Sequence, residues 1–433
     1  MKAIYYQNEE YPNNPFIEAL PSLPDAQTLA DALARKPHYD TDSRLLPSTQ
    51  RLALCGKLFE VYQPLVMTYA LYFQVRNAMV HSFANKQSVQ DTQQTVQLYH
   101  ALQNKRVCAS TGGGNSFAVV GASGVGKSTA MQQVLAQFPQ QIEHEHYHGY
   151  SFCCKQIPYL VVQTPHDASV KGLCLDIMLQ IDDLLGTQYY KRALTSRATT
   201  DMLTSQLAQI TRTVNLGLLV IDELQNISYS KSGGDVRFLN FIVQLINSAH
   251  LSTCLVGTPQ VLDTLQREFR SARRATGFVY DRLPDAEEFS LLLNTMWAYQ
   301  YVTNQSELTP EIRAWLYRKS QGVADIVVKL LYHAQMFAII SGSETLGIKE
   351  LDAAWHGNMQ MVQQFIKDMD DAPLNAKKVA RKVPSVAHNS LNLPKGSANN
   401  QDKQDVYAMQ QEALKNGISP VEALASYIQE ITL

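Results

Sequence analysis

The sequence predicts an α/β protein in which helices cover both faces of a parallel sheet, with a small helical domain and an extension at each end. Apolar, strand-like segments alternate with helical patterns between residues 105 and 285. Strands separated by helices form parallel sheets. A glycine-rich loop joins one such segment to a helix, and two carboxylates follow another. We expect these features to meet at the carboxyl edge of the sheet, where ligands bind in open α/β folds.

Two segments precede this core in the sequence. Residues 1–48 contain many proline, asparagine and aspartate residues with little periodicity, which predicts an extended arm. Residues 49–104 form an N-terminal helical region, in which Pro64 is expected to interrupt or begin a helix. The core spans 105–285. Its expected strands are 116–120, 158–163, 217–221 and 252–257, and its clearest helices are 171–186 and 236–249.

The remaining chain is predicted to be helical and then irregular. Residues 286–365 form the expected small helical lid, with segments near 286–301, 309–318, 323–340 and 348–363. A linker with proline, asparagine and lysine follows at 366–404, and 405–433 is expected to be a short helical tail.

Composition indicates an ordinary globular protein of more than one domain. The 433 residues are 45% hydrophobic and 18% charged, and the net charge is −2. Without a general positive field, contacts with double-stranded DNA would need a local basic patch. The six cysteines lack zinc-type spacing, and we expect buried, reduced thiols. We find neither a membrane-length apolar stretch nor a signal-peptide core, so we expect a cytoplasmic protein with no membrane partner.

The most specific motif is the run from Gly121 to Thr129, which fits G-x-x-x-x-G-K-[ST]. An apolar segment precedes it and a helical pattern follows it, as this Walker A loop requires. Its backbone N–H groups would hold ATP phosphates, Lys127 would reach the outer phosphates, and Ser128 would bind Mg²⁺. The nucleotide-binding candidates are Gly121, Ala122, Ser123, Gly124, Val125, Gly126, Lys127, Ser128 and Thr129.

A second motif supplies carboxylates for the same reaction. Four apolar residues, 218–221, predict a strand buried on both faces, and Asp222 and Glu223 follow it directly. Asp222 would help to hold Mg²⁺, and Glu223 would orient or deprotonate a water molecule. A solvated acidic strand end is the alternative for this pair.

Two later features resemble those of AAA+ ATPases. Thr258 ends the strand after the carboxylate strand, where AAA+ enzymes place a residue that contacts the outer phosphate or the attacking water. A simple strand-end cap is the alternative. Arg270, Arg273 and Arg274 then lie close together after a helical segment. They could stabilise the transferring phosphate from a neighbouring subunit, or they could be a solvated basic helix end.

Several segments together resemble TnsC, the AAA+ regulator of transposons that also encode TnsA and TnsB. They follow one another in the same order from about residue 10 to 340, whereas 365–433 matches poorly. The segments are Asn14–Pro21, Tyr62–Leu65, Leu216–Gln225, Lys231–Gly234, Gly257–Pro259, Arg270–Phe278 and Ser320–Leu330.

The resemblance implies a bacterial AAA+ P-loop ATPase that uses ATP and Mg²⁺ and assembles as a ring or filament on double-stranded DNA. It would link a TniQ- or TnsD-type target selector, bound by the arm, to the TnsA and TnsB transposase, with TnsA bound by the tail. Whether an RNA-guided complex chooses the target stays open. A replication initiator or helicase loader of the AAA+ class is the alternative.

DNA-contacting and metal-binding residues are harder to assign. By similarity to AAA+ proteins, Thr164, Ser169 and Lys171 could line a DNA pore, although a solvated surface is the ordinary role of such residues. His144, His146 and His148 alternate before Cys153 and Cys154. Because the usual zinc spacing is absent, an exposed edge or loop is the better interpretation of that segment.

Overall fold

The computed structural model describes residues 1–84, 116–196, 198–229, 234–249, 251–261 and 276–363. Six strands form one sheet in the order β2-β3-β4-β5-β1-β6. The five strands from β3 to β6 run parallel, and β2 pairs antiparallel with β3 at one edge. The strands are β1 (Phe117–Gly121), β2 (Ile142–Tyr147), β3 (Tyr150–Gln163), β4 (Leu216–Asp222), β5 (Ser252–Gly257) and β6 (Thr276–Tyr280).

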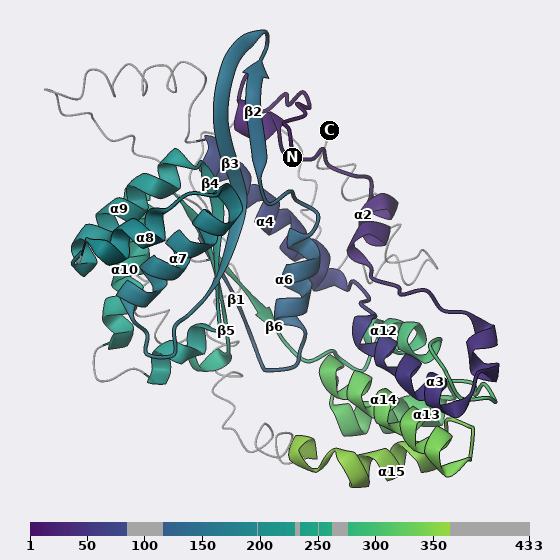
Figure 1. The fold of residues 1–433 in the computed structure, drawn as a ribbon. Helices are drawn as coiled ribbons and strands as arrows, with labels where there is room; N and C mark the ends of the chain where they lie inside the picture. The colour runs from purple at the N-terminus through teal and green to yellow at the C-terminus, as the bar shows by residue number, and fades with distance from the viewer. Residues whose placement is uncertain (85–115, 197, 230–233, 250, 262–275, 364–433) are drawn as a thin grey trace, which may run out of the picture.

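Helices cover both faces of this sheet (Figure 1). The helices α4 (Val66–Ala84) and α6 (Lys127–Leu135) cover one face, where Leu218 and Val220 of β4 contribute to the core. The other face carries Leu219 and Ile221 of the same strand, as the two-residue period of a strand requires. Its covering helices are α7 (Val170–Leu185), α8 (Tyr189–Thr195), α9 (Thr200–Thr213) and α10 (Gly234–Ala249).

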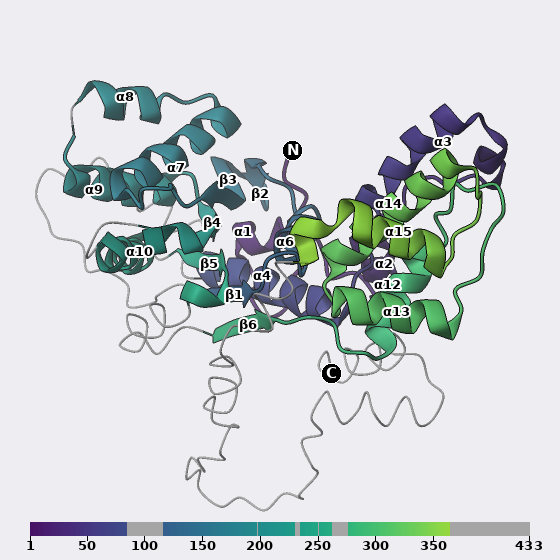
Figure 2. The ribbon, with the colours of Figure 1, turned by 90° about the horizontal axis from the view of Figure 1, so that it is seen from below.

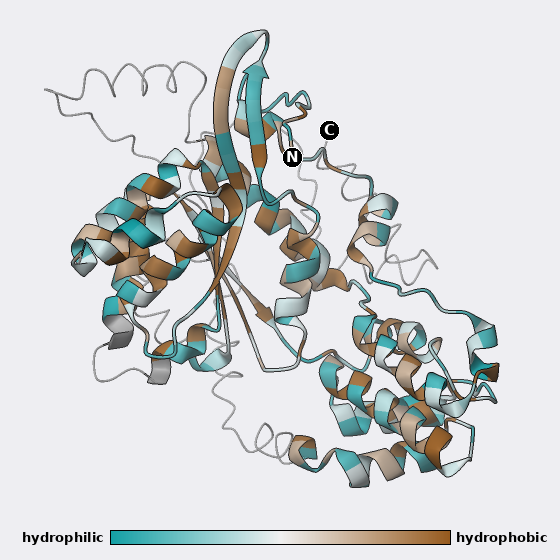
Figure 3. Cartoon of the chain, viewed as in Figure 1, coloured by the Kyte–Doolittle hydropathy of each residue, from teal (hydrophilic) through white to brown (hydrophobic). Residues whose placement is uncertain are grey.

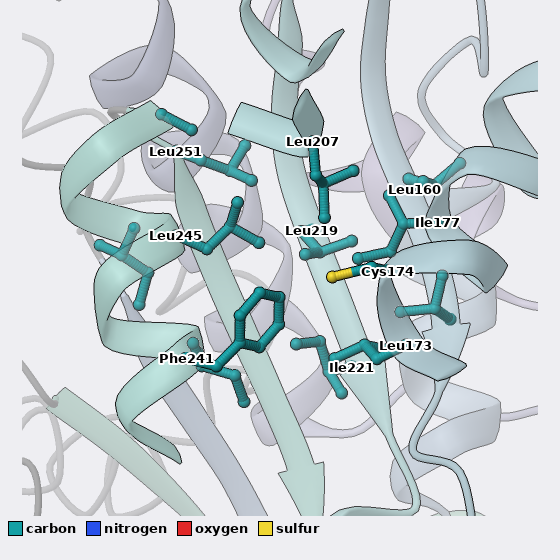
Figure 4. Packing of buried hydrophobic residues seen from close by; sticks show 14 of the residues in the cluster. Leu160, Leu173, Cys174, Ile177, Leu207, Leu219, Ile221, Phe241, Leu245 and Leu251 are labelled. Carbon is teal, nitrogen blue, oxygen red and sulfur yellow. The ribbon is translucent and has the colours of Figure 1, made fainter. Parts of the chain in front are cut away.

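Apolar side chains fill the space between the sheet and this second set of helices. Figure 4 shows Leu219 and Ile221 between Cys174 and Ile177 of α7 and Phe241 of α10. In Figure 3 the brown, hydrophobic surfaces of these helices turn toward the strands. The expected buried thiols are confirmed for Cys55, Cys174 and Cys254, whereas Cys153 is exposed and Cys154 is half-buried. Cys108 lies outside the described residues.

A separate helical unit lies to one side of the sheet, as Figure 2 shows from below, and near the carboxyl ends of the strands in Figure 1. It has its own apolar core, which residues of the N-terminal region join. Its helices are α12 (Glu287–Trp297), α13 (Pro310–Ser320), α14 (Ala324–Ser341) and α15 (Ile348–Asn358), with α3 (Ser48–Leu54) and the 3-10 helix η2 (Cys55–Glu60) beside them. We call this unit the lid. We expected no apolar segment of membrane-spanning length, but among the described residues α14 alone is long and apolar enough to cross a membrane. Its inner face contributes to the apolar core of the lid.

The N-terminal arm is less extended than we expected. It contains α1 (Pro15–Glu18), α2 (Ala26–Leu33) and the 3-10 helix η1 (Thr41–Leu45). Asn14 begins α1, since its Oδ1 accepts hydrogen bonds from Phe16 N and Ile17 N while its Nδ2 donates to Phe83 O. Phe16 stacks on Phe83 and also contacts Phe152 of β3. The part of the arm that contains α1 and α2 therefore belongs to the core of the sheet domain.

The expected strands agree with β1, β3, β4 and β5 within a few residues, except that β3 begins eight residues earlier. Strands β2 and β6 were not expected. His144 of β2 is buried, and its ring nitrogens contact the Tyr5 hydroxyl and Gln156 Oε1. A register shift separates His144 from His146, which is exposed together with His148. No cluster of metal-binding side chains occurs within the described ranges.

Two further 3-10 helices follow strands at the carboxyl edge: η3 (Leu224–Tyr229) after β4 and η4 (Pro259–Val261) after β5. The linker, the tail, residues 85–104 of the N-terminal helical region and residues 105–115 of the predicted core lie outside the described residues.

Candidate nucleotide-binding site

The loop between β1 and α6 has the backbone that a phosphate-binding loop needs. Gly126 comes directly before α6 with a φ of 98°, a left-handed conformation that glycine adopts without steric cost. A Cβ on Gly121 would lie 2.2 Å from Tyr280 O, so this strand position also requires glycine. The loop thus ends at the N-terminus of α6, where backbone N–H groups and the helix dipole favour an anion.

Lys127 lies inside this loop. Its Nζ donates hydrogen bonds of 2.8 Å to both Gly121 O and Ala122 O. Burial lowers the pKa of this amine, and the negative charges of Asp222 and Glu223 partly oppose that shift. Among the described residues, the hydrogen bonds of Lys127 go to neutral carbonyls. A buried cation in that setting gains much from an added anion, so phosphate oxygens suit Lys127.

Ser128 and Asp222 meet across the sheet. Ser128 Oγ donates to Asp222 Oδ2 at 3.0 Å, although 94 residues separate them in sequence. A hydroxyl and a carboxylate beside a phosphate loop form an oxygen donor set of the kind that Mg²⁺ takes. The residues present therefore fit a magnesium nucleotide, in which the metal would neutralise phosphate charge.

Glu223 follows Asp222 at the point where the chain turns out of β4. Its φ is 56°, a left-handed conformation that is uncommon for glutamate. The exposed side chain accepts a hydrogen bond from Gln225 Nε2, and Glu223 N donates to Asp222 Oδ1 at 2.7 Å. An unfavourable backbone conformation of this kind is common at functional sites.

The strand order explains why Thr258 belongs to the same site. β5 lies between β1 and β4, so Thr258, which follows β5, lies between the phosphate loop and the two carboxylates. Its Oγ1 is buried and has no hydrogen-bond partner among the residues that the structure describes. An unpaired buried hydroxyl at this place is the atom that a phosphate oxygen or a water molecule would satisfy.

These groups line one cavity of about 380 Å³ that continues between the sheet domain and the lid. Beyond the phosphate loop its walls become apolar, as suits a nucleotide base. This part is lined by Val61, Leu65, Met67, Leu292, Met296 and Val328, with Tyr62 and Glu288 beside them. Burial raises the pKa of Glu288, whose Oε1 accepts a hydrogen bond from Val66 N. The lid meets the phosphate loop directly, because Asp325 N donates to Gly124 O at 3.1 Å.

A family model described as "AAA domain" matches residues 110–265. With the strand order above, the fold is that of an AAA+ P-loop NTPase. The match includes Lys127, Ser128, Asp222, Glu223 and Thr258, which all line the cavity described above.

Solved structures similar to the chain include AAA+ proteins of archaea. Aeropyrum pernix Orc1 in complex with DNA is 15% identical, with 68% of this chain and 70% of that chain covered and a TM-score of 0.41. Cdc6p of Pyrobaculum aerophilum is 14% identical, with 56% of this chain and 60% of that chain covered and a TM-score of 0.38. A Walker-type ATPase of Pyrococcus abyssi is 12% identical, with 67% of this chain and 75% of that chain covered and a TM-score of 0.37. These similarities are too distant to indicate function. No curated protein matches the chain.

Other residues named from the sequence lie elsewhere. Thr164, a candidate DNA contact, is buried, and its Oγ1 and N both donate to Asp222 O at 2.9 Å. It supports the end of β4 instead. Ser169 caps α7 by accepting a hydrogen bond from Gly172 N, and Lys171 is exposed in the first turn. Arg270, Arg273 and Arg274 lie outside the described residues.

Sequence patterns missed the residues that form the apolar end of the cavity. Tyr62 and Leu65 come from the N-terminal region, and Leu292 and Met296 come from α12. The helical spacing of these apolar residues predicted only that they pack inside the protein, and gave no sign of a binding site. Gln225 was also missed as a site residue, although its position beside Asp222 and Glu223 was a usable signal.

Proposed function

We propose that this protein is a magnesium-dependent ATPase whose nucleotide state controls its assembly on double-stranded DNA. The observation that carries the ATPase part is the convergence of Lys127, Ser128, Asp222 and Glu223 at one cavity. Lys127 and the loop bind the phosphates, Ser128 and Asp222 hold the metal, and Glu223 takes a proton from water.

We further propose that its biological role is that of TnsC: to connect a target selector to the TnsA and TnsB transposase, in the bacterial cytoplasm. The ordered series of motifs from Asn14 to Leu330 supports this role. The arm motif itself is buried from Asn14 to Leu20, so a selector of the TniQ or TnsD type would bind more exposed parts of the arm.

Assembly would place nucleotide between copies of the chain. The three arginines, Arg270, Arg273 and Arg274, would reach the nucleotide of a neighbouring copy and stabilise its outer phosphate. Loss of that phosphate would weaken the contact, which would couple hydrolysis to release from DNA.

The test is binding of a fluorescent DNA duplex with a non-hydrolysable ATP analogue, with ADP and without nucleotide. We expect tight binding and ring or filament images only with the ATP analogue. Equal affinity under all three conditions would contradict the proposed coupling. Capture of TnsA–TnsB by the assembled form distinguishes the transposition role from that of a replication initiator or helicase loader, which would retain a helicase instead.

A further inference from the structure

We propose that Gln225 is a positioning residue for hydrolysis. It holds the Glu223 carboxylate and the attacking water molecule in the relative position that proton transfer requires. The inference rests on the ATPase function proposed above and adds a residue to that same site. Gln225 is the second residue of the 3-10 helix η3, two positions after Glu223.

The first observation is the orientation of the Gln225 amide. Its Nε2 donates a hydrogen bond to Glu223 Oε2. An ionised carboxylate only accepts hydrogen bonds, so the amide must turn its NH₂ group toward Glu223. This contact also fixes the position of Gln225 Oε1, because Oε1 and Nε2 are bonded to the same carbon atom, Cδ.

The second observation is that this amide oxygen is unpaired. In the part of the chain that the structure describes, five buried side-chain N or O atoms have no hydrogen-bond partner. Three of them belong to residues that line the nucleotide cavity together with Glu223: Gln225 Oε1, Thr258 Oγ1 and Tyr280 Oη. Leaving a buried polar atom unpaired is unfavourable, so Gln225 Oε1 favours a hydrogen-bonding ligand or water.

The two observations give Gln225 a defined part in the reaction. The water oxygen forms a bond to the outermost phosphorus, and one water proton passes to Glu223. The bond from that phosphorus to the bridging oxygen breaks, and ADP leaves with the bonding electrons. The second water hydrogen stays on the product phosphate and, during attack, donates to Gln225 Oε1. Gln225 thereby sets the positions of both the base and the nucleophile.

The decisive variant is Gln225→Met, which keeps the side-chain length but removes both hydrogen-bonding groups. We expect single-turnover hydrolysis to fall about 30-fold or more, within the range for loss of a positioned catalytic contact. The Kd for Mg-ATP should stay within about twofold, since the phosphate and base contacts are unchanged.

Two phosphate analogues separate positioning from a structural role. Aluminium fluoride with ADP mimics the transition state together with its water, whereas beryllium fluoride with ADP mimics bound ATP. Gln225→Met should weaken binding of the first about tenfold or more and leave the second unchanged. The matched control is Gln137→Met, because Gln137 Nε2 donates to Ala32 O and Gln133 O away from the cavity.

A second variant, Gln225→Glu, covers the case in which Gln225→Met fails to fold. It retains an acceptor but places a second negative charge against Glu223, and we expect the same loss of hydrolysis with nucleotide still bound. Wild-type single-turnover rates in the folded variants would overturn the inference, as would equal weakening of both analogues. Wild-type hydrolysis by Glu223→Gln would exclude Glu223 as the base, whereas a wild-type protein that hydrolyses no ATP would overturn the ATPase assignment itself.

Discussion

At the scale of single residues, hydrogen bonds hold the side chains around the loop between β1 and α6. Lys127 contacts two carbonyl oxygens of its own loop, and Ser128 contacts Asp222. In the function that we propose, these contacts would reduce the rearrangement that binding of a magnesium nucleotide requires.

Replacing Lys127 tests the phosphate contact. Lys127→Ala should raise the Kd for Mg-ATP about 100-fold, because charge-assisted hydrogen bonds contribute about 2–3 kcal/mol. Isothermal calorimetry gives this value, and Lys349→Ala on the exposed side of α15 is the control. An unchanged Kd for Lys127→Ala would exclude this loop as the phosphate site.

Replacing Ser128 tests the metal contact. Ser128→Ala should raise the Mg²⁺ concentration for half-maximal hydrolysis about tenfold, because one oxygen donor is lost. Ser128→Thr keeps the hydroxyl and should behave like the wild type. The role of Ser128 at the metal would be wrong if the alanine and threonine variants had the same Mg²⁺ dependence.

At the scale of elements, an ion pair fastens the N-terminal region to the lid. Arg51 of α3 donates to both carboxylate oxygens of Glu344, which follows α14, at 2.6 and 2.7 Å. It also donates to Tyr301 O at 3.0 Å. Hydrogen bonds from Arg51 lower the pKa of Glu344 from 4.5 to about 2. The charged form of Glu344 therefore stabilises the fold.

This ion pair predicts a pH-dependent stability. Because the pKa of Glu344 is lower in the folded state, its contribution is complete above pH 4.5 and is lost as the pH falls toward about 2. Glu344→Gln should lower the free energy of unfolding at pH 7 by about 2 kcal/mol. In urea titrations from pH 7 to 3, the difference from the wild type should shrink below pH 4.5. A constant difference would contradict the assignment.

The elements also show what a sequence can predict. The strands β4 and β5 were predictable because their apolar runs are buried on both faces. The edge strand β2 was not, since its inward His144 is satisfied by Tyr5 and Gln156 from distant segments. The phosphate end of the site depends on local motifs and was predicted. The base-binding end joins Tyr62 to Leu292 of the lid, and only folding brings these residues together.

At the scale of the whole molecule, the nucleotide cavity joins the sheet domain, the N-terminal region and the lid. Bound nucleotide would therefore fix the lid relative to the sheet, and an assembly of copies would depend on that arrangement. With a net charge of −2, the chain has no general attraction for DNA.

Assembly predicts that activity depends on protein concentration. If neighbouring copies complete the site, the hydrolysis rate per subunit should rise at least about tenfold between dilute monomer and the DNA-bound assembly. Rates measured across a dilution series, with and without duplex DNA, check this. Replacement of Arg270, Arg273 and Arg274 by alanine should remove the rise and spare nucleotide binding. A constant rate per subunit would contradict a shared site.

The central claim is that Glu223 takes the proton of a water molecule that attacks bound ATP. The most direct measurement compares Glu223→Gln with the wild type for Mg-ATP affinity and single-turnover hydrolysis. We expect unchanged affinity and hydrolysis slowed about 100-fold or more, since the amide cannot accept that proton. Hydrolysis at the wild-type rate would contradict the claim.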